Sequence, residues 1–309
     1  MAAGVIAILL TGAVAQALPD GAPTLPQQAQ IIDQLSQNVL EEVLPPYEAN
    51  ASTEFLWRGV NSSSLKERPF HIYSSEFYDV IGSDPSLTLI ATSESDPIFH
   101  EAVTWNPTTD EMFFVQNAGD PDAGTGLNKS SIIQKISLLD AEELRNGTFG
   151  ATAVPVHTVP STPQVINPNE GGTNYKGNLV FAGSGQGDRL ASALYLMNPV
   201  EPYNTTVLVN NFFGRAFNSL NDVAVNPRNL NIYFTDTLYG YLQNFRPAPG
   251  LRNQVYRLDP STGSLSVVAD GFTLPNGITF SPNGEYAYVT DTGMAHAFFG
   301  ENLTDPSTM

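Results

Sequence analysis

Two stretches of this chain share one pattern: NDVAVNPRNLNIYFTDT, residues 221–237, and NGITFSPNGEYAYVTDT, residues 276–292. Each opens with Asn, has Pro at its seventh position and Tyr at its thirteenth, and closes on Thr-Asp-Thr. The first residues, Asn221 and Asn276, are 55 positions apart (276 minus 221). Self-similarity at a fixed spacing of this size indicates a repeat architecture.

A third, more diverged copy, EAVTWNPTTDEMFFVQN, occupies residues 101–117. It has Pro107 at the seventh position and the aromatic Phe113 at the thirteenth, but its first residue is Glu101. Glu101 precedes Asn221 by 120 residues (221 minus 101), which is close to two spacings. We therefore expect one further unit between them, and residues 164–182 are the candidate.

Each copy reads as two short strands joined by a turn that contains Pro and Asn or Gly, a pattern typical of antiparallel hairpins. Residues 255–258 and 265–268 predict two more strands after the copy at 221–237. About four strands in a unit of roughly 50 residues is typical of a propeller blade. No unit has the apolar period of a long helix. The sequence therefore predicts an all-β chain.

The first position of each copy carries the chemistry. Equivalent positions of propeller blades converge on the central axis, so Glu101, Asn221 and Asn276 are expected to meet. One carboxylate and two amide carbonyls offer the hard oxygen ligands that Ca²⁺ prefers and that Mg²⁺ or Mn²⁺ also accepts. The alternative is that each Asn caps a turn or satisfies backbone groups.

Neighbours of these positions are weaker candidates. His100 could act as a base or orient a ligand, although adjacent residues of a strand point to opposite faces. The aspartates of the copies either support the ligand residues without binding the ligand, or they simply mark the ends of strands; they are Asp222, Asp236 and Asp291. The Gly-rich run at residues 183–188 precedes no helix pattern and lacks Lys, which favours a loop between strands over a phosphate site.

Composition narrows the function classes. The formal charge is −18, from 13 Lys and Arg against 31 Asp and Glu, so nucleic acid and anionic membranes are poor partners. This charge suits a cation or a neutral small molecule, or serves solubility alone. The chain has no Cys, which excludes disulfides and thiolate metal sites, and its four His lack zinc-motif spacing. It has no G-x-S-x-G motif, which argues against a serine esterase.

The first residues predict secretion. Residues 1–17 read as a signal peptide, with a short membrane anchor as the alternative, but the apolar run is too short to span a bilayer. After cleavage we expect no membrane association. Residues 18–68 form an N-terminal arm, in which the period of Ile31 to Leu44 predicts a helix, and residues 69–309 form the propeller. Six sequons predict N-glycosylation at Asn50, Asn61, Asn128, Asn146, Asn204 and Asn302.

Several motifs resemble a known family. They are FHEAV at 99–103 with Trp105, LNDV at 220–223, YFTD at 233–236, VYRLDP at 255–260, LPNGI at 274–278 and SPNG at 281–284. They look like the regucalcin and gluconolactonase family, also called senescence marker proteins. From Pro69 to Thr292 the chain is more closely similar to secreted fungal lactonohydrolases.

The resemblance implies a six-bladed β-propeller with one divalent metal, usually Ca²⁺, on its axis. It implies Glu101 as carboxylate ligand, Asn276 as amide ligand and Asn221 as ligand or substrate contact. The implied reaction opens an aldonolactone or similar lactone to a hydroxy acid. The alternatives are a binding-only or inactive propeller, and a phosphotriesterase-like or arylesterase-like hydrolase.

The chain departs from the family pattern at two places. The family's remaining ligand is an Asp in a Pro-Asp-Gly motif beyond the Asn-Gly site, but no such motif follows Asn276. Ser219 stands where relatives with sugar-lactone activity have Arg. Residues 69–309 also suffice for only about four to five repeat units. We therefore expect an incomplete, C-terminally truncated propeller of uncertain activity.

Overall fold

The computed structural model describes residues 25–33, 35, 39–45, 48, 56–57, 60–93, 98–119, 123–168, 171–294, 296, 300 and 307–308. The predicted signal peptide and the sequons at Asn50 and Asn302 lie outside these residues. The chain divides into two compact units, Met1–Thr88 and Leu89–Met309. The division follows Thr88, so residues 69–88, which the sequence analysis placed in the propeller, belong with the N-terminal unit.

The N-terminal unit is built on a parallel pair of strands, β1 (Ala29–Ile31) and β2 (Phe70–Ile72). Helix α1 (Ser62–Glu67) begins with a capping box on Asn61, and helix α2 (Phe77–Ile81) follows β2. Ala29, Ile72 and Tyr78 form the small core between these elements. Because β2 pairs with β1, the residues after Pro69 fold with this unit.

The helix predicted over Ile31 to Leu44 is wrong for the residues that the structure describes there. Ile31 ends β1, and residues 39–45 have no regular structure. Leu35 and Val39 are 90% and 93% exposed, so the predicted apolar face is not buried. The backbone pairing of β1 with β2 takes the start of the segment into an extended conformation, which overrides the helical period.

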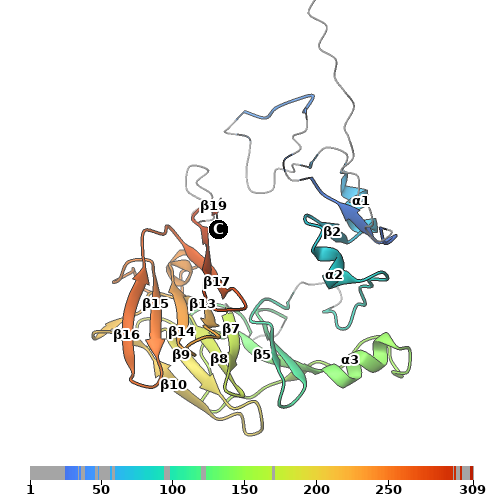
Figure 1. Ribbon diagram of the computed structural model, residues 1–309. Helices are drawn as coiled ribbons and strands as arrows, with labels where there is room; N and C mark the ends of the chain where they lie inside the picture. The colour runs from blue at the N-terminus through green and yellow to red at the C-terminus, as the bar shows by residue number, and fades with distance from the viewer. Residues whose placement is uncertain are drawn as a thin grey trace, which may run out of the picture. The chain divides into compact units, whose positions relative to one another are not determined.

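The second unit consists mainly of four antiparallel sheets in which consecutive strands pair (Figure 1). The first sheet contains β3 (Thr104–Asn106), β4 (Glu111–Gln116), β5 (Ile132–Ser137) and β6 (His157–Thr158). The second contains β7 (Gly171–Tyr175), β8 (Asn178–Gly183), β9 (Ala193–Met197) and β10 (Thr205–Val209).

The third sheet contains β13 (Leu220–Val225), β14 (Ile232–Asp236), β15 (Gln254–Asp259) and β16 (Ser264–Ala269). The fourth contains β17 (Pro275–Phe280), β18 (Ala287–Thr292) and β19 (Ser307–Thr308). The remaining elements are the hairpin of β11 (Asn211–Phe212) and β12 (Arg215–Ala216), and the helices α3 (Leu138–Arg145) and α4 (Tyr239–Leu242).

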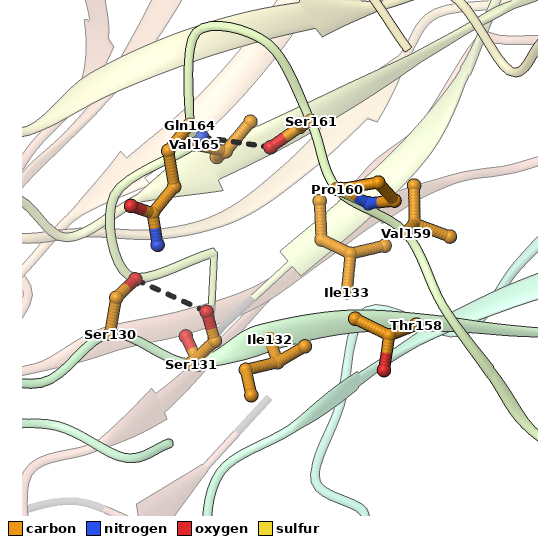
Figure 2. A pocket seen from close by; sticks show the side chains of 10 residues that line it. All are labelled: Ser130, Ser131, Ile132, Ile133, Thr158, Val159, Pro160, Ser161, Gln164 and Val165. Carbon is orange, nitrogen blue, oxygen red and sulfur yellow. Dashed lines mark hydrogen bonds between the residues drawn. The ribbon is translucent and has the colours of Figure 1, made fainter. Parts of the chain in front are cut away.

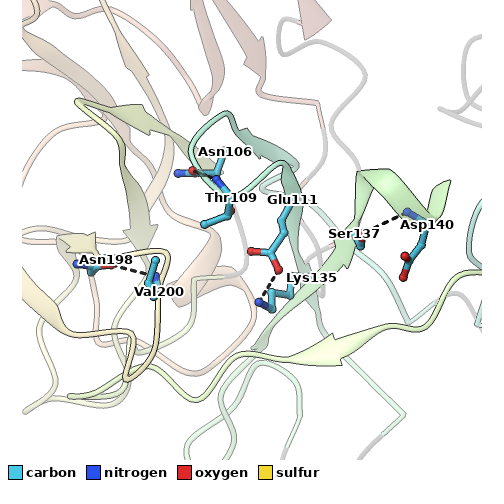
Figure 3. A network of polar contacts seen from close by, with 8 residues as sticks. All are labelled: Asn106, Thr109, Glu111, Lys135, Ser137, Asp140, Asn198 and Val200. Atoms are coloured by element: carbon cyan, nitrogen blue, oxygen red, sulfur yellow. Dashed lines mark hydrogen bonds and ion pairs between the residues drawn. The ribbon is translucent and has the colours of Figure 1, made fainter. Parts of the chain in front are cut away.

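The predicted hairpins are present, and the prediction of an all-β chain is confirmed in part, because the described residues are mostly β but include short helices. The three sequence copies coincide with β3–β4, β13–β14 and β17–β18, and the unit expected within residues 164–182 contains β7 and most of β8. A short helix, α3, follows β5 directly. It begins after Ser137, whose hydroxyl accepts a hydrogen bond of 3.1 Å from the Asp140 N–H (Figure 3).

The first strands of successive sheets lie side by side: β3 with β7, β7 with β13, and β13 with β17. Apolar side chains fill the space between sheets. One core cluster includes Phe113 of β4 and Phe181 of β8, and the next includes Val180 of β8 and Phe234 of β14. Successive antiparallel sheets that pack face to face, with their first strands side by side, are arranged like the blades of a propeller.

Asparagines at the sixth position of two copies join neighbouring sheets. Asn106 Nδ2 donates to the carbonyl of Gly177, 3.1 Å away in the β7–β8 turn, and Asn226 Nδ2 donates to the carbonyl of Gly284, 3.0 Å away in the β17–β18 turn. Each amide oxygen also accepts from its own turn; Figure 3 shows this bond between Asn106 and Thr109. One side chain therefore closes a turn and links two sheets.

A buried carboxylate and a buried guanidinium fix the segment that leads into β13. Asp236 accepts the N–H groups of Ser219 and Asn218 at 2.8 and 3.1 Å. Arg246 donates to four backbone carbonyls, two before β13 and two in the β8–β9 loop. Because these groups satisfy backbone atoms that no strand pairs, they hold the loops at this end of the sheets.

No helix in the described part of the chain is long and apolar enough to cross a membrane.

Gly171 marks the closest approach between β7 and β13. A Cβ atom at this position would lie 2.6 Å from Asp222 Cα and 2.9 Å from Asn221 O, and closer still to Asp222 Oδ1. We predict that Gly171→Ala destabilises the fold by roughly 2 kcal/mol, because the added Cβ would overlap buried backbone atoms and no side-chain rotation can remove that overlap. Gly150→Ala, where a Cβ meets no atom within 4 Å, should change stability by less than about 0.5 kcal/mol. Chemical denaturation measures both, and equal effects of the two substitutions would contradict the close packing.

Stability should also depend on pH through Asp236. Burial raises the pKa of Asp236 to about 7, against the lowering effect of its N–H donors and of nearby Arg246. The folded state therefore binds the carboxyl proton of Asp236 more tightly than the unfolded chain does, in which this group has its ordinary pKa of 3.8. The resulting stabilisation is complete below about pH 4 and is lost as the pH rises to about 7.

Denaturation of wild type and Asp236→Asn between pH 4 and 8 checks this. The wild type should lose free energy of unfolding relative to the variant as the pH rises, whereas an exposed control, Asp270→Asn, should follow the wild type. Parallel curves for wild type and Asp236→Asn would show that the carboxyl of Asp236 titrates alike in both states.

Candidate metal and lactone site

The predicted ligand positions lie at the same end of the first strands. Asn221 and Asn276 are each the second residue of their strand, β13 and β17, and Glu101 precedes β3. Asn221 is buried, Asn276 is half-buried and Glu101 is exposed. In the second sheet, the first strand β7 begins at Gly171. The neighbouring order of the strands brings the polar first positions to one edge.

Asp222 ties the two asparagine positions together. Its Oδ2 accepts the N–H of Ile278 in the neighbouring sheet at 2.7 Å, and its Oδ1 accepts the N–H of Val223 at 2.8 Å. Burial raises the pKa of Asp222 to about 6, although both hydrogen bonds lower it. Asp222 directly follows Asn221, and its partner Ile278 lies two residues after Asn276. The bond between them therefore fixes the position of one asparagine along its strand relative to the other.

Thr235 provides a second tie between the same strands. Its hydroxyl accepts the N–H of Asp222 at 3.0 Å and donates to the carbonyl of Asn276 at 2.7 Å. Thr290 repeats half of this arrangement in the next sheet, where its hydroxyl accepts the N–H of Gly277 at 2.8 Å. The first Thr of each Thr-Asp-Thr motif therefore holds the third residue of the first strand in its own sheet.

Glu101 is electrostatically coupled to this group. Although its side chain reaches solvent, the surrounding protein removes enough water to raise the pKa of Glu101, and the negative charge of Asp222 raises it further. The neighbouring His100 lowers the same pKa. The charges of His100 and Asp222 therefore both act on the carboxyl group of Glu101.

His100 is exposed and its N–H donates to the carbonyl of Val115 at 2.8 Å. His100 affects the site by lowering the pKa of Glu101. Its role as a base stays a prediction.

The side chain of Asn276 is oriented by a short chain of hydroxyls. Its amide nitrogen faces Thr292 Oγ1 at 3.5 Å, and the same Oγ1 lies 2.5 Å from the hydroxyl of Tyr239 in α4. Because the nitrogen is used in this contact, the amide oxygen is the atom that Asn276 presents elsewhere. Sequence reasoning missed Tyr239, since nothing in its local pattern marks it.

The aspartates of the Thr-Asp-Thr motifs end strands and also hold backbone. Asp291 accepts the N–H groups of Leu274 and Thr273 at 2.8 and 2.9 Å, as Asp236 does for Ser219 and Asn218. Both bind the segment directly before an asparagine of the predicted site. The two alternatives for these residues are therefore compatible: each closes its hairpin and supports the entry to a first strand.

The donor set fits a hard divalent cation by its chemistry. Glu101 supplies a carboxylate, and Asn221 and Asn276 supply amide groups, which are the oxygen ligands that Ca²⁺ takes. Asp222 adds negative charge behind them, with both oxygens already accepting N–H groups. No cluster of three or more His, Cys, Asp or Glu suited to a metal occurs among the described residues.

Gly171 could have been found by closer reading of the sequence, and Asp222 is already among the aspartates expected to support the site. A Gly-Gly pair at the start of a strand signals close backbone approach, and Asp222 occupies the position where the other copies carry small residues. The Gly-rich run at 183–188 is a loop between β8 and β9, as predicted.

Comparisons with known proteins agree with these motifs. Residues 189–298 match the model of the SMP-30/Gluconolactonase/LRE-like region. Lactonohydrolase oryL of Aspergillus oryzae is 27% identical over 251 residues, which cover 78% of this chain and 51% of that protein. Lactonohydrolase oryH of the same organism is 23% identical over 272 residues, covering 69% and 53%. The chain thus spans about half the length of the curated relatives it matches.

Among solved structures, a gluconolactonase of Xanthomonas campestris aligns with a TM-score of 0.46 and 23% identity, covering 63% of this chain and 55% of that one. The resemblance predicted from the motifs is confirmed by sequence: the chain is similar to the SMP-30/gluconolactonase/LRE-like family over residues 189–298, and to fungal lactonohydrolases over most of its length.

Proposed function

We propose that this chain contributes the catalytic face of a Ca²⁺-dependent lactone hydrolase, which opens an aldonolactone or a similar lactone to a hydroxy acid. The observation that carries the proposal is the position of Asp222. This carboxylate is bonded across to the strand of Asn276, follows Asn221 directly and is electrostatically coupled to Glu101. The lactonohydrolases and the gluconolactonase named above support the reaction class.

In the proposed site, Glu101, Asn221 and Asn276 hold the cation. When bound, Ca²⁺ or another hard divalent ion supplies Lewis acidity to the lactone carbonyl. The residues of the chain bind and orient: Asp222 and Thr235 keep the two asparagines in register, and Tyr239 with Thr292 turns the amide of Asn276.

The overall reaction adds one water to the lactone. The water oxygen bonds to the carbonyl carbon, the ring C–O bond breaks, and a proton passes to the departing oxygen, which leaves a hydroxy acid. His100 is our candidate for the group that moves this proton, because it is exposed beside Glu101 and an imidazole can both accept and donate a proton.

Secretion and N-glycosylation belong to the same proposal. The sequon asparagines Asn61, Asn128, Asn146 and Asn204 are all exposed, as glycan acceptors must be. The formal charge of −18 favours a cation and a neutral substrate over anionic ones. The six-bladed ring of the family stays a prediction.

Replacing the acidic ligand tests the site. Glu101→Gln keeps the shape of the side chain and removes its charge, so Ca²⁺ affinity should fall at least about tenfold, because ligand charge sets the affinity of such sites. Hydrolysis of glucono-1,5-lactone should fall with it. Glu143→Gln removes one exposed charge from α3 and should leave both properties unchanged.

Calorimetric titration with Ca²⁺ and a pH-stat assay of lactone hydrolysis supply the two readouts. Folded protein that neither binds Ca²⁺ nor hydrolyses lactones would support a binding-only role, and turnover of phosphotriesters or aryl esters but not lactones would move the proposal to that class. Equal Ca²⁺ affinity of Glu101→Gln and wild type would remove Glu101 from the metal site.

A further inference from the structure

A pocket of about 370 Å³ lies beside the first sheet. Its walls are the start of β5, the end of β6 and the segment that leads from β6 toward β7 (Figure 2). Ligand pockets in proteins start at roughly this volume. The mechanism proposed above uses none of the residues that line it.

The floor of the pocket is apolar. Ile133, Val159 and Val165 line it and belong to the buried core cluster between the two sheets. Ile132 and Pro160 add further apolar surface, and Figure 2 shows these side chains around the cavity. Such a lining favours an aliphatic or aromatic group over a polyhydroxylated one, because hydroxyl groups buried there would lose water without finding partners.

One polar group in the wall has no partner. Ser131 is 2% exposed, and its hydroxyl makes no hydrogen bond among the described residues. The neighbouring hydroxyls are already used: Ser130 donates to the carbonyl of Ser131 at 3.1 Å, and Ser161 accepts the N–H of Val165 at 3.0 Å. A buried hydroxyl without a partner costs stability, so its retention points to a ligand that completes it.

The pocket lies at the same end of the sheet as Glu101. The carbonyl of Glu101 accepts the N–H of Val115, and Val115 pairs directly with Ile133. Two strand spacings of about 4.8 Å therefore separate Glu101 from the pocket floor along one cross-strand row, which gives roughly 10 Å. An alkyl or aryl-alkyl substituent on a lactone ring can span this distance.

The mouth of the pocket is polar. Ser130 and Gln164 line both this pocket and an adjoining one formed with Asn128, Lys129 and Gln186. In Figure 2 the amide of Gln164 extends from the upper loop toward Ser130, so Gln164 stands over the opening. A polar rim above an apolar floor suits a ligand with a polar head and an apolar tail.

We propose that this pocket binds the apolar substituent of the substrate, so that the chain acts on lactones with an alkyl or aryl-alkyl side chain in preference to polyhydroxylated aldonolactones. The identity of the ligand as a substrate rests on the proposed function, whereas the binding of an apolar chain does not.

Binding of an apolar chain in the pocket is tested without Ca²⁺ and without turnover, with 1-octanol as the probe. Titration followed by methyl NMR should shift the resonances of Ile133 and Val159 saturably. Ser131→Ala should weaken octanol binding about fivefold, the loss of one hydrogen bond, without destabilising the free protein. Absence of any shift at these methyl groups would overturn the proposal, whatever the enzymatic activity.

The substrate half is tested by comparing hydrolysis of δ-decalactone and glucono-1,5-lactone. Gln164→Trp fills the mouth from an exposed position, and should lower the ratio of kcat/KM for δ-decalactone over glucono-1,5-lactone at least about tenfold, mainly through KM. Val200→Trp, in the turn between β9 and β10, is the matched control and should leave the ratio unchanged.

These outcomes separate the two proposals. Octanol binding with no hydrolysis of either lactone would refute the proposed function and leave the pocket as a binding site. Hydrolysis of glucono-1,5-lactone with an unchanged ratio in Gln164→Trp would leave the function in place and refute the role of the pocket in specificity.

Discussion

The carboxylate of Asp222 is the interaction on which the candidate site depends. First strands of neighbouring sheets are not paired in a common ladder, so side chains must set their relative register. Asp222 does this by accepting the N–H of Ile278 across the gap, and Thr235 adds a parallel bond to the carbonyl of Asn276. A carboxylate with two N–H donors is a stiff connection, since charge-assisted hydrogen bonds are stronger than neutral ones.

The same design recurs away from the site, where Asn106 and Asn226 link the turns at the opposite end of the first strands. The sheets of β13 and β17 are thus linked by polar side chains at both ends of these strands, and those of β3 and β7 are linked at one end. Apolar side chains pack between the sheets. A site assembled in this way is only as well ordered as the contacts between sheets, because no single sheet contains it.

Much of this fold is predictable from sequence because its signals are local. Pro and Asn or Gly turns between short strands predict the hairpins at residues 221–237 and 276–292, and their repetition predicts equivalent first positions. The bond from Asp222 to Ile278 is not predictable in this way, since it joins residues that only the packing of two sheets brings together. The helix expected at Ile31 to Leu44 fails for a related reason: its apolar period is local, but the pairing partner of Ile31 is Ile72, far along the chain.

In the proposed site, Glu101, Asn221 and Asn276 surround one cation. Paramagnetic broadening by Mn²⁺, a hard divalent ion that accepts the same oxygen ligands, tests this directly in isotope-labelled protein. At substoichiometric Mn²⁺ the side-chain amide signals of Asn221 and Asn276 and the backbone N–H of Glu101 should broaden before all others, and Ca²⁺ should reverse the effect. Broadening confined to other acidic residues, with these three signals intact, would contradict the site.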